Sequence, residues 1–246
     1  AGMMGQGIAY VSAKAGIGVV LKDMTQESAD KGKLYSEPLL KKQVSRGRML
    51  QSDADKVLNR ITATCNDEDL KGCDLIIEAV FENLELKHTI TESAELYLAD
   101  KGIWGSNTST LPISELARAS KKPENFIGIH FFSPVDKMPL VEIIVGEKTS
   151  DETLAKAFDF VQQIKKTPIV VNDSLGFFTS RTFATYLDEG LHLLVEGYSP
   201  VQIDNMGKAI GMPVGPLQVG DEVSLELTRK AQETWTEMGV ADKSSN

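Results

Sequence analysis

Short apolar runs alternate with longer polar, helix-favouring segments through the first two thirds of the chain. Apolar runs of strand length bounded by polar residues or glycine predict β-strands, and the segments between them predict helices. The expected strands cover residues 19–21, 74–80, 102–106, 126–131, 140–145 and 168–171. The expected helices cover residues 5–15, 26–48, 52–58, 84–98 and 150–164. This alternation predicts an α/β fold with a mostly parallel sheet and helices on both of its faces.

The strand pattern stops after Val171, and only helical patterns follow. The Gly- and Pro-rich stretch 211–216 interrupts these patterns, as does Ser199-Pro200, because Gly and Pro break helices. The expected helices cover residues 176–197, 201–210 and 221–238. We therefore expect an α/β domain over residues 1–172 and an all-helical domain over residues 173–246.

Composition and charge narrow the function classes. The net formal charge is −9, from 26 basic and 35 acidic residues, which argues against a nucleic-acid partner because such binding needs clustered positive charge. No apolar run approaches the ~18 residues of a membrane span. Two cysteines, Cys65 and Cys73, exclude a disulfide scaffold and favour a reducing, cytoplasmic location. Three histidines without a Cys/His cluster predict no structural metal site.

The chain opens with Gly2-Met3-Met4-Gly5, which matches the last two glycines of the fingerprint G-x-G-x-x-G. In that motif the backbone approaches a pyrophosphate, which faces a helix N-terminus. Asp23 ends the next expected strand, close to the ~20-residue separation of the carboxylate that binds the adenosine ribose. An acid there favours NAD over NADP, because it repels the 2′-phosphate. The alternative is an ordinary helix start followed by a surface aspartate.

Polar residues follow two of the expected strands. Glu78 and Glu82 bracket the end of one strand, and Ser106–Thr110 follow another. Ligands of open parallel sheets bind beyond the carboxyl ends of the strands, so these residues are candidates for binding. Each also has a simpler explanation. Glu82 would be a charge near a helix N-terminus capped by Asn83, Lys87 would be solvated, and Ser106–Thr110 would form a turn with a helix cap.

His130 is the most informative ionisable residue. It ends an expected strand, and Glu142 lies on the next one, so adjacent strands can bring the two within hydrogen-bond distance. An imidazole held by a carboxylate accepts a proton near neutral pH, as a general base does. The alternative is a packed, hydrogen-bonded core histidine. His88 and His192 lie in expected helices and are interpreted as structural or surface residues.

A basic tract stands out in this acidic chain. It would face a phosphate-bearing substrate such as coenzyme A, or else form a solvated helix face. Glu37 is the acid within the tract. Its basic members are Lys31, Lys33, Lys41, Lys42, Arg46 and Arg48.

Several motifs in the same order resemble the L-3-hydroxyacyl-CoA dehydrogenase family. The match is best with the dehydrogenase part of the alpha subunit of bacterial fatty-acid oxidation complexes, and it covers nearly the whole chain. The motifs are DLIIEAVFENLELK at 74–87, SNTST at 106–110, HFFSPV at 130–135, MPLVEI at 138–143 and PIVVND at 168–173. The resemblance implies a Rossmann-type NAD-binding domain followed by a helical C-terminal domain that closes the cleft.

The resemblance also implies a reaction, the NAD-dependent oxidation of L-3-hydroxyacyl-CoA to 3-ketoacyl-CoA in fatty-acid β-oxidation. It implies that His130 is the general base, that Glu142 is its partner, and that Ser109 hydrogen-bonds the substrate oxygen beside the nicotinamide. The implied NAD contacts are Gly2, Met3, Met4, Gly5, Asp23, Val80, Phe81, Glu82, Lys87, Ser109 and Ser133. The implied substrate contacts are Ser36, Ser109 and Ser180.

The chain departs from the family pattern at three kinds of position. Ser133 replaces a common Asn, Leu175 replaces a Pro, and Ser180 replaces an Asn that contacts substrate. The shorter Ser180 hydroxyl still forms hydrogen bonds, directly or through water, and this departure leaves the orientation of the thioester and the chain preference open. The first strand and first fingerprint glycine are expected upstream of Ala1, together with a hydratase/isomerase domain, and the helical domain is expected to extend past Asn246.

The resemblance further implies a homodimer through the helical domain and a thiolase subunit as partner. Two other functions stay open. One is a short-chain 3-hydroxybutyryl-CoA dehydrogenase, which a series of acyl-chain lengths would distinguish. The other is a non-catalytic NAD-binding or structural relative on the same fold, which loss of His130 or Glu142 would have favoured.

Overall fold

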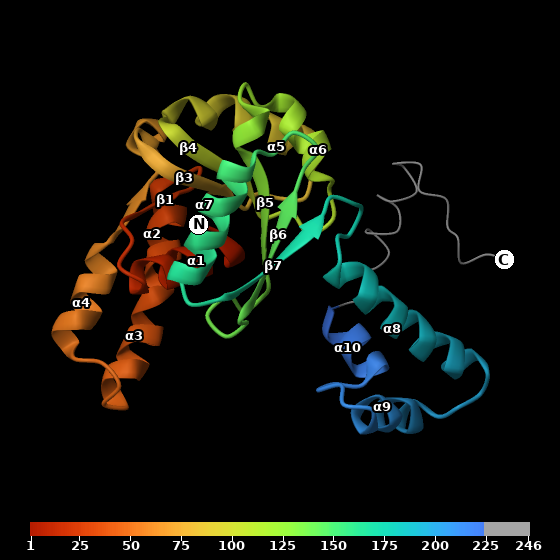
Figure 1. Cartoon of the computed structure of the whole chain (residues 1–246). Helices are drawn as coiled ribbons and strands as arrows, with labels where there is room; N and C mark the ends of the chain where they lie inside the picture. Colours follow the sequence, from red (N-terminus) through yellow and green to blue (C-terminus); the bar gives the residue numbers. More distant parts are fainter. Residues whose placement is uncertain (224–246) are drawn as a thin grey trace. The chain divides into compact units, whose positions relative to one another are not determined.

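The computed structural model of the chain describes residues 1–223 (Figure 1). It divides into two compact units, of which the first covers Ala1–Ser174 and the second begins at Leu175. Within residues 1–223, every strand belongs to the first unit and the second unit is helical.

The first part of unit 1 is a parallel strand pair packed against helix α1. β1 and β2 run side by side with Val19 opposite Ile61, and α1 packs on both strands. The connection between the strands is helical, and α3 and α4 pack against each other as they extend from the sheet (Figure 1). The elements are α1 (Met3–Lys14), β1 (Val19–Lys22), α2 (Gln26–Leu34), α3 (Ser36–Ser45), α4 (Gln51–Asn59), β2 (Ile61–Thr64) and the 3-10 turn η1 (Asp67–Leu70).

The second part of unit 1 is a sheet that, within residues 1–223, has the order β3-β4-β5-β6-β7. Its neighbouring strands are parallel except for β5 and β6, which are antiparallel. Helix α7 packs across β4 to β7. The elements are β3 (Cys73–Glu78), α5 (Leu84–Ala94), η2 (Glu95–Tyr97), β4 (Leu98–Ser106), α6 (Ile113–Leu116), η3 (Ala117–Ala119), η4 (Pro123–Asn125), β5 (Phe126–Phe131), β6 (Leu140–Val145), α7 (Asp151–Gln163) and β7 (Thr167–Asn172).

Side-chain caps set the starts of the helices that follow these strands. Asn83 accepts a hydrogen bond from the Leu86 amide at 2.8 Å and so caps α5, as the sequence predicts. Ser150 accepts one from the Thr153 amide at 3.2 Å and caps α7. The Asn83 cap starts α5 a few residues after β3 ends, and the Ser150 cap starts α7 a few residues after β6 ends.

The two sheets share one hydrophobic core. Leu21 of β1 and Ile61 of β2 belong to the same cluster as Ile129 of β5, Ile143 of β6 and Val161 of α7. Each of these side chains is less than 9% exposed. Burial of this apolar area supplies the main favourable term for folding. The Rossmann-like expectation of a mostly parallel sheet with flanking helices is therefore confirmed.

The second unit is a helical array. The Tyr186 hydroxyl of α8 donates to the Val214 carbonyl at 2.9 Å, and Asp204 of α9 accepts a hydrogen bond from the Leu217 amide at 2.9 Å, which starts α10. The elements are α8 (Thr179–Val195), α9 (Pro200–Ala209) and α10 (Pro216–Val223). The predicted helix over 221–238 lies outside the described residues from 224 onward.

Some boundaries differ from the sequence prediction. The single helix expected over 26–48 is broken between α2 and α3, because Pro38 lacks an amide and is tolerated only in the first turn of a helix. Strand β2 was not predicted, and β4 begins at Leu98 rather than at 102. The helix expected over 84–98 ends at Ala94.

Candidate active site

Helix α1 begins without a side-chain cap. Gly2 is its N-cap residue, no side chain hydrogen-bonds to the first amides, and no acidic residue lies in the first turn. Such an end presents unpaired amides and a positive dipole end, which favour an anionic group. A Cβ added at Gly2 or Gly5 would meet nothing within 4 Å, so a ligand can approach the backbone closely.

Asp23 follows β1 and lies beside the start of α1. Its Oδ2 is 2.9 Å from the amino nitrogen of Ala1, and its Oδ1 accepts a hydrogen bond from the Met24 amide at 2.7 Å. Partial burial would raise the pKa of the Asp23 carboxyl, whereas the Met24 amide and the charge of Lys22 lower it. The carboxyl group lies next to the N-terminus of α1.

Gly7 allows α1 to pack on the loop that follows β5. A Cβ at Gly7 would lie 2.8 Å from the Cβ of Val135, which is closer than side chains pack. Any larger residue would push α1 away from this loop. Gly7 is not among the predicted site residues, although its place in the glycine-rich opening of the chain indicates a close backbone approach.

A buried ion pair joins α5 to the end of β3. Lys87 is only 1% exposed, and its Nζ donates to both carboxylate oxygens of Glu78 at 3.0 Å. The same carboxylate accepts hydrogen bonds from the Ser106 hydroxyl and, at 3.2 Å, from the Val80 amide. These bonds offset the cost of burying the charges. Lys87 is therefore fixed at the carboxyl end of β3 and is not solvated.

Glu82 binds the turn that follows β4. Its Oε1 accepts hydrogen bonds from the Thr108 hydroxyl at 2.5 Å, from the Ser109 and Thr110 amides at 2.9 Å, and from the Thr110 hydroxyl at 3.0 Å. Its Oε2 lies 3.3 Å from the Nζ of Lys87. Burial would raise the pKa of the Glu82 carboxyl, but Lys87 and the turn donors outweigh it and lower that pKa.

These contacts gather predicted residues at one edge of the sheet. Glu82, Lys87 and Ser109 form a polar cluster where β3 and β4 end, with the Ser109 hydroxyl 3.4 Å from Glu82 Oε1. Asn107 connects the cluster to β5, because its side-chain oxygen accepts a hydrogen bond from the Phe131 amide at 2.9 Å. The turn that carries Ser109 is thereby tied to the residue that follows His130 in the chain.

His130 and Glu142 lie directly opposite each other in the antiparallel pair β5–β6. Nδ1 of His130 is 2.7 Å from Oε2 of Glu142, Glu142 is fully buried, and His130 is 6% exposed. A carboxylate only accepts hydrogen bonds, so Nδ1 carries the proton and Nε2 is the basic nitrogen. The ring of Phe132 packs on the imidazole with centroids 4.5 Å apart.

The loop that carries Ser133 is held by Lys166. The Lys166 ammonium donates to the carbonyls of Val135 at 2.6 Å and Met138 at 2.5 Å. Burial lowers the pKa of Lys166, and the nearby carboxylate of Asp136 opposes this shift. Lys166, which directly precedes β7, thus fixes this loop at residues shortly after Ser133.

Other predicted residues lie outside these contacts. Ser36 is fully buried at the start of α3, and its hydroxyl has no hydrogen-bond partner in the described part of the chain. Met3 and Phe81 are strongly exposed. Ser180 belongs to α8 in the second unit. The binding roles of these residues stay predictions.

The basic tract follows α2 into α3 and the turn after it. Most of its side chains are exposed, and Lys41 pairs with Glu37 at 3.3 Å. This arrangement is compatible with a phosphate-bearing substrate and with a solvated helix face. His88 is structural, as the sequence suggested, because its Nε2 lies 3.0 Å from the Glu115 carbonyl.

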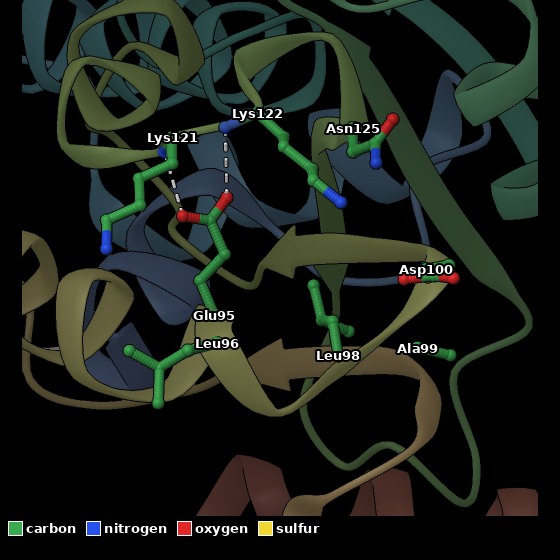
Figure 2. A pocket seen from close by; sticks show the side chains of 9 residues that line it. Glu95, Leu96, Leu98, Ala99, Asp100, Lys121, Lys122 and Asn125 are labelled. Carbon is green, nitrogen blue, oxygen red and sulfur yellow. Dashed lines mark hydrogen bonds between the residues drawn. The ribbon is translucent and has the colours of Figure 1, made fainter.

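A pocket lies at the opposite end of β4 from this cluster (Figure 2). It encloses about 200 Å³, and the carboxylate of Glu95 accepts hydrogen bonds there from the amides of Lys121 at 2.8 Å and Lys122 at 3.4 Å. Leu98 to Gly102 of its lining belong to the amino-terminal end of β4. Ligands of open parallel sheets bind at the carboxyl ends, so the candidate active site lies at the other edge.

Two further findings apply to the part of the chain that the structure describes. No helix within residues 1–223 is long and apolar enough to cross a membrane. No group of His, Cys, Asp and Glu side chains in that range is arranged to hold a metal ion.

Comparison with known proteins identifies the family. The model of the 3-hydroxyacyl-CoA dehydrogenase NAD binding domain matches residues 1–174, and the model of the 3-hydroxyacyl-CoA dehydrogenase C-terminal domain matches residues 176–245. The chain is 43% identical over 230 residues to the fatty acid oxidation complex subunit alpha of Shewanella sp. (strain W3-18-1). That match covers 93% of this chain and 33% of the relative, so the chain spans about a third of the curated relatives that it matches.

Solved structures agree with this result. The (S)-3-hydroxybutyryl-CoA dehydrogenase from Ralstonia eutropha is 35% identical with a TM-score of 0.92, over 97% of this chain and 85% of that one. The 3-hydroxybutyryl-CoA dehydrogenase from Escherichia coli K12 is 27% identical with a TM-score of 0.93, over 98% of this chain and 52% of that one. The predicted resemblance and the predicted cofactor, NAD, are therefore confirmed. The chain belongs to the 3-hydroxyacyl-CoA dehydrogenase family.

Proposed function

We propose that this chain oxidises L-3-hydroxyacyl-CoA to 3-ketoacyl-CoA in fatty-acid β-oxidation, with NAD as the hydride acceptor. The pairing of His130 with Glu142 at 2.7 Å carries the proposal. A buried imidazole held at one nitrogen by a carboxylate is the arrangement that a general base for a hydroxyl group needs. Family membership and the names of the relatives support the substrate class.

The residues at the carboxyl ends of the strands fit NAD. The uncapped start of α1 suits a pyrophosphate, and the carboxylate of Asp23 suits the adenosine ribose. NAD, when bound, accepts the hydride from C3 of the substrate. The residues proposed to hold it are Gly2, Met3, Met4, Gly5, Asp23, Val80, Phe81, Glu82, Lys87, Ser109 and Ser133.

In this proposal the Nε2 atom of His130 accepts the proton of the substrate's 3-hydroxyl group. Glu142 keeps Nδ1 protonated and stabilises the imidazolium that forms, because it already accepts a hydrogen bond from that nitrogen. Loss of the hydroxyl proton makes the C3–H bond a better hydride donor. Burial of the pair excludes water and strengthens its electrostatic effect.

Ser109 is proposed to donate a hydrogen bond to the substrate oxygen. Its amide is already fixed by Glu82 at 2.9 Å, so its hydroxyl is presented from a rigid turn. Ser180 and Ser36 are proposed to contact the acyl-CoA. For Ser36 this requires α3 to open, since its hydroxyl is buried.

A short-chain 3-hydroxybutyryl-CoA substrate is the second candidate. It is favoured by the similarity to the Ralstonia eutropha 3-hydroxybutyryl-CoA dehydrogenase, which extends over 97% of this chain. The name of the Shewanella relatives, fatty acid oxidation complex subunit alpha, favours a role in fatty-acid oxidation and a partner subunit. Pairing with a thiolase subunit and dimerisation through the helical unit belong to the first proposal.

The test is steady-state oxidation of 3-hydroxybutyryl-CoA and 3-hydroxydecanoyl-CoA with NAD, followed by the absorbance of NADH. We expect activity with at least one substrate, and the ratio of the two kcat/KM values decides between the candidates. NADP should be used poorly because Asp23 repels its 2′-phosphate. Binding of NAD without oxidation of either substrate would favour a non-catalytic relative and would contradict the proposal.

A further inference from the structure

Asp173 binds a helix that lies far from it in the sequence. It follows β7 by one residue, and the first unit ends at the next residue, Ser174. Its Oδ1 accepts a hydrogen bond from the Ile113 amide and its Oδ2 accepts one from the Ser114 amide, each at 2.8 Å. These are the first two amides of α6.

Helix α6 has no cap from its own sequence. Pro112 occupies the N-cap position and has no side-chain acceptor. The first amides of a helix lack intrahelical partners, so the two oxygens of Asp173 supply bonds that the local sequence cannot. The helix is otherwise seated in the core, since Ile113 and Leu116 are almost fully buried. Asp173 therefore fixes the start of α6 to the end of the first unit.

Helix α6 begins shortly after the turn that carries Ser109. Leu111 separates this turn from Pro112, and the Leu111 amide donates to the Thr108 hydroxyl at 3.0 Å. Leu111 is itself buried, so the connection cannot move independently of its ends.

Three carboxylates from other elements thus hold the segment 106–114. Glu78 binds Ser106 at its beginning, and Glu82 binds the turn in its middle. Asp173 binds its end through the amides of α6. Glu82 belongs to the polar cluster of the candidate active site and Glu78 binds its Lys87, whereas Asp173 lies outside the cluster.

We propose that Asp173 is a positioning residue of the reaction. It binds the start of α6, and through α6 it holds the turn that carries Ser109 in a fixed place relative to the end of the first unit. This inference rests on the proposed function, in which Ser109 contacts the substrate. Asp173 acts through α6 and touches neither substrate nor cofactor. Its loss should therefore affect turnover and acyl-CoA binding more than NAD binding, because Ser109 is one of several proposed NAD contacts.

The variants Asp173→Ala and Asp173→Asn test this in the full chain, with Ser150→Ala as the matched control. Ser150 also caps a helix of the first unit, α7, and its hydroxyl bonds to Thr153 of that helix. We expect Asp173→Ala to lower kcat ~10- to 100-fold, the scale of a misplaced reacting group, and to raise KM for acyl-CoA. KM for NAD should change less than KM for acyl-CoA, because the other proposed NAD contacts do not depend on α6. Asp173→Asn keeps one acceptor and should be intermediate, and Ser150→Ala should keep its kcat despite a comparable fall in Tm.

Amide hydrogen exchange supplies a readout that does not depend on activity. Asp173→Ala should speed exchange at Ile113 and Ser114 and also at 108–111, whereas Ser150→Ala should not. The inference is overturned if faster exchange stays confined to α6, or if kcat falls no further than in Ser150→Ala. If the unaltered chain oxidises no 3-hydroxyacyl-CoA, the proposed function fails, and exchange at 108–111 alone decides whether Asp173 positions the turn. If Asp173→Ala does not fold, Asp173→Asn is judged by the same criteria.

Discussion

Single carboxylates organise the candidate active site, and each one holds a different kind of partner. Glu142 holds an imidazole nitrogen, Glu78 a buried ammonium and Glu82 a pair of turn amides. A carboxylate that accepts charged or backbone donors in a buried place forms stronger hydrogen bonds than neutral groups do. Removing any one of them leaves a buried donor unpaired, which is costly.

The first prediction concerns His130, which is proposed as the general base. His130→Gln should lower kcat by ~10²-fold or more, because glutamine cannot take a proton from the substrate hydroxyl. His88→Gln is the control, since His88 sits in α5 and bonds to a backbone carbonyl. Initial rates with NAD and a 3-hydroxyacyl-CoA give the comparison. A near-normal rate in His130→Gln would remove this residue from the mechanism.

Glu82 should also make folding stability depend on pH. Its pKa is lowered in the folded protein from an ordinary value near 4.5, so its contribution to stability is complete above pH about 4.5 and is lost as the pH falls through the folded pKa. Glu82→Gln lacks this contribution. Urea unfolding at neutral and acidic pH should show a smaller loss of stability on acidification in Glu82→Gln than in the unaltered chain. Parallel curves for the two would rule out a linkage to Glu82.

The sequence indicates some of these residues better than others. The pairing of His130 with Glu142 could be predicted, because His130 lies near the end of one apolar run and Glu142 near the start of the next. Burial of Lys87 was not anticipated, although it lies on the inward face of α5 with Thr91 and Ala94, at spacings typical of a helix. The Asp173 cap could not be foreseen, since only tertiary structure brings it to α6.

Among the secondary-structure elements, strands with long apolar runs were the most predictable. The bounds of β5 and β6 agree with the prediction because every residue of β5 and most of β6 are buried. Strand β2 was missed because it has four residues, of which Ile61 is the single large apolar one. Helix α1 was predictable from its small residues, but its close packing on the loop after β5 was not.

Two glycines of α1 should respond oppositely to the same substitution. Gly7→Ala places a Cβ 2.8 Å from Val135 and should destabilise the chain by ~1–3 kcal/mol through overpacking. Gly5→Ala meets nothing within 4 Å and should leave Tm unchanged or higher, because alanine favours helix. Gly5→Ala should instead weaken NAD binding in a titration. Equal losses of Tm in the two variants would contradict this packing of α1.

For the whole molecule, the sequence predicted a Rossmann-like part followed by a helical part, and the family models divide the chain in the same order. The alternation of strand and helix patterns predicts the Rossmann-like part, because helices and sheet bury their apolar faces against each other. The strand order was not predicted, since periodicity does not show which strands pair.

The strands of both sheets pack into one core, so the chain around β1 is joined to the chain around β5 by shared apolar contacts. Asp23 follows β1, whereas His130 lies on β5. A dinucleotide held by Asp23 and by the loops after β3 and β4 would bind only when both segments are folded, so saturating NAD should slow the proteolysis of both segments. Protection of one segment alone would mean that NAD contacts only that segment.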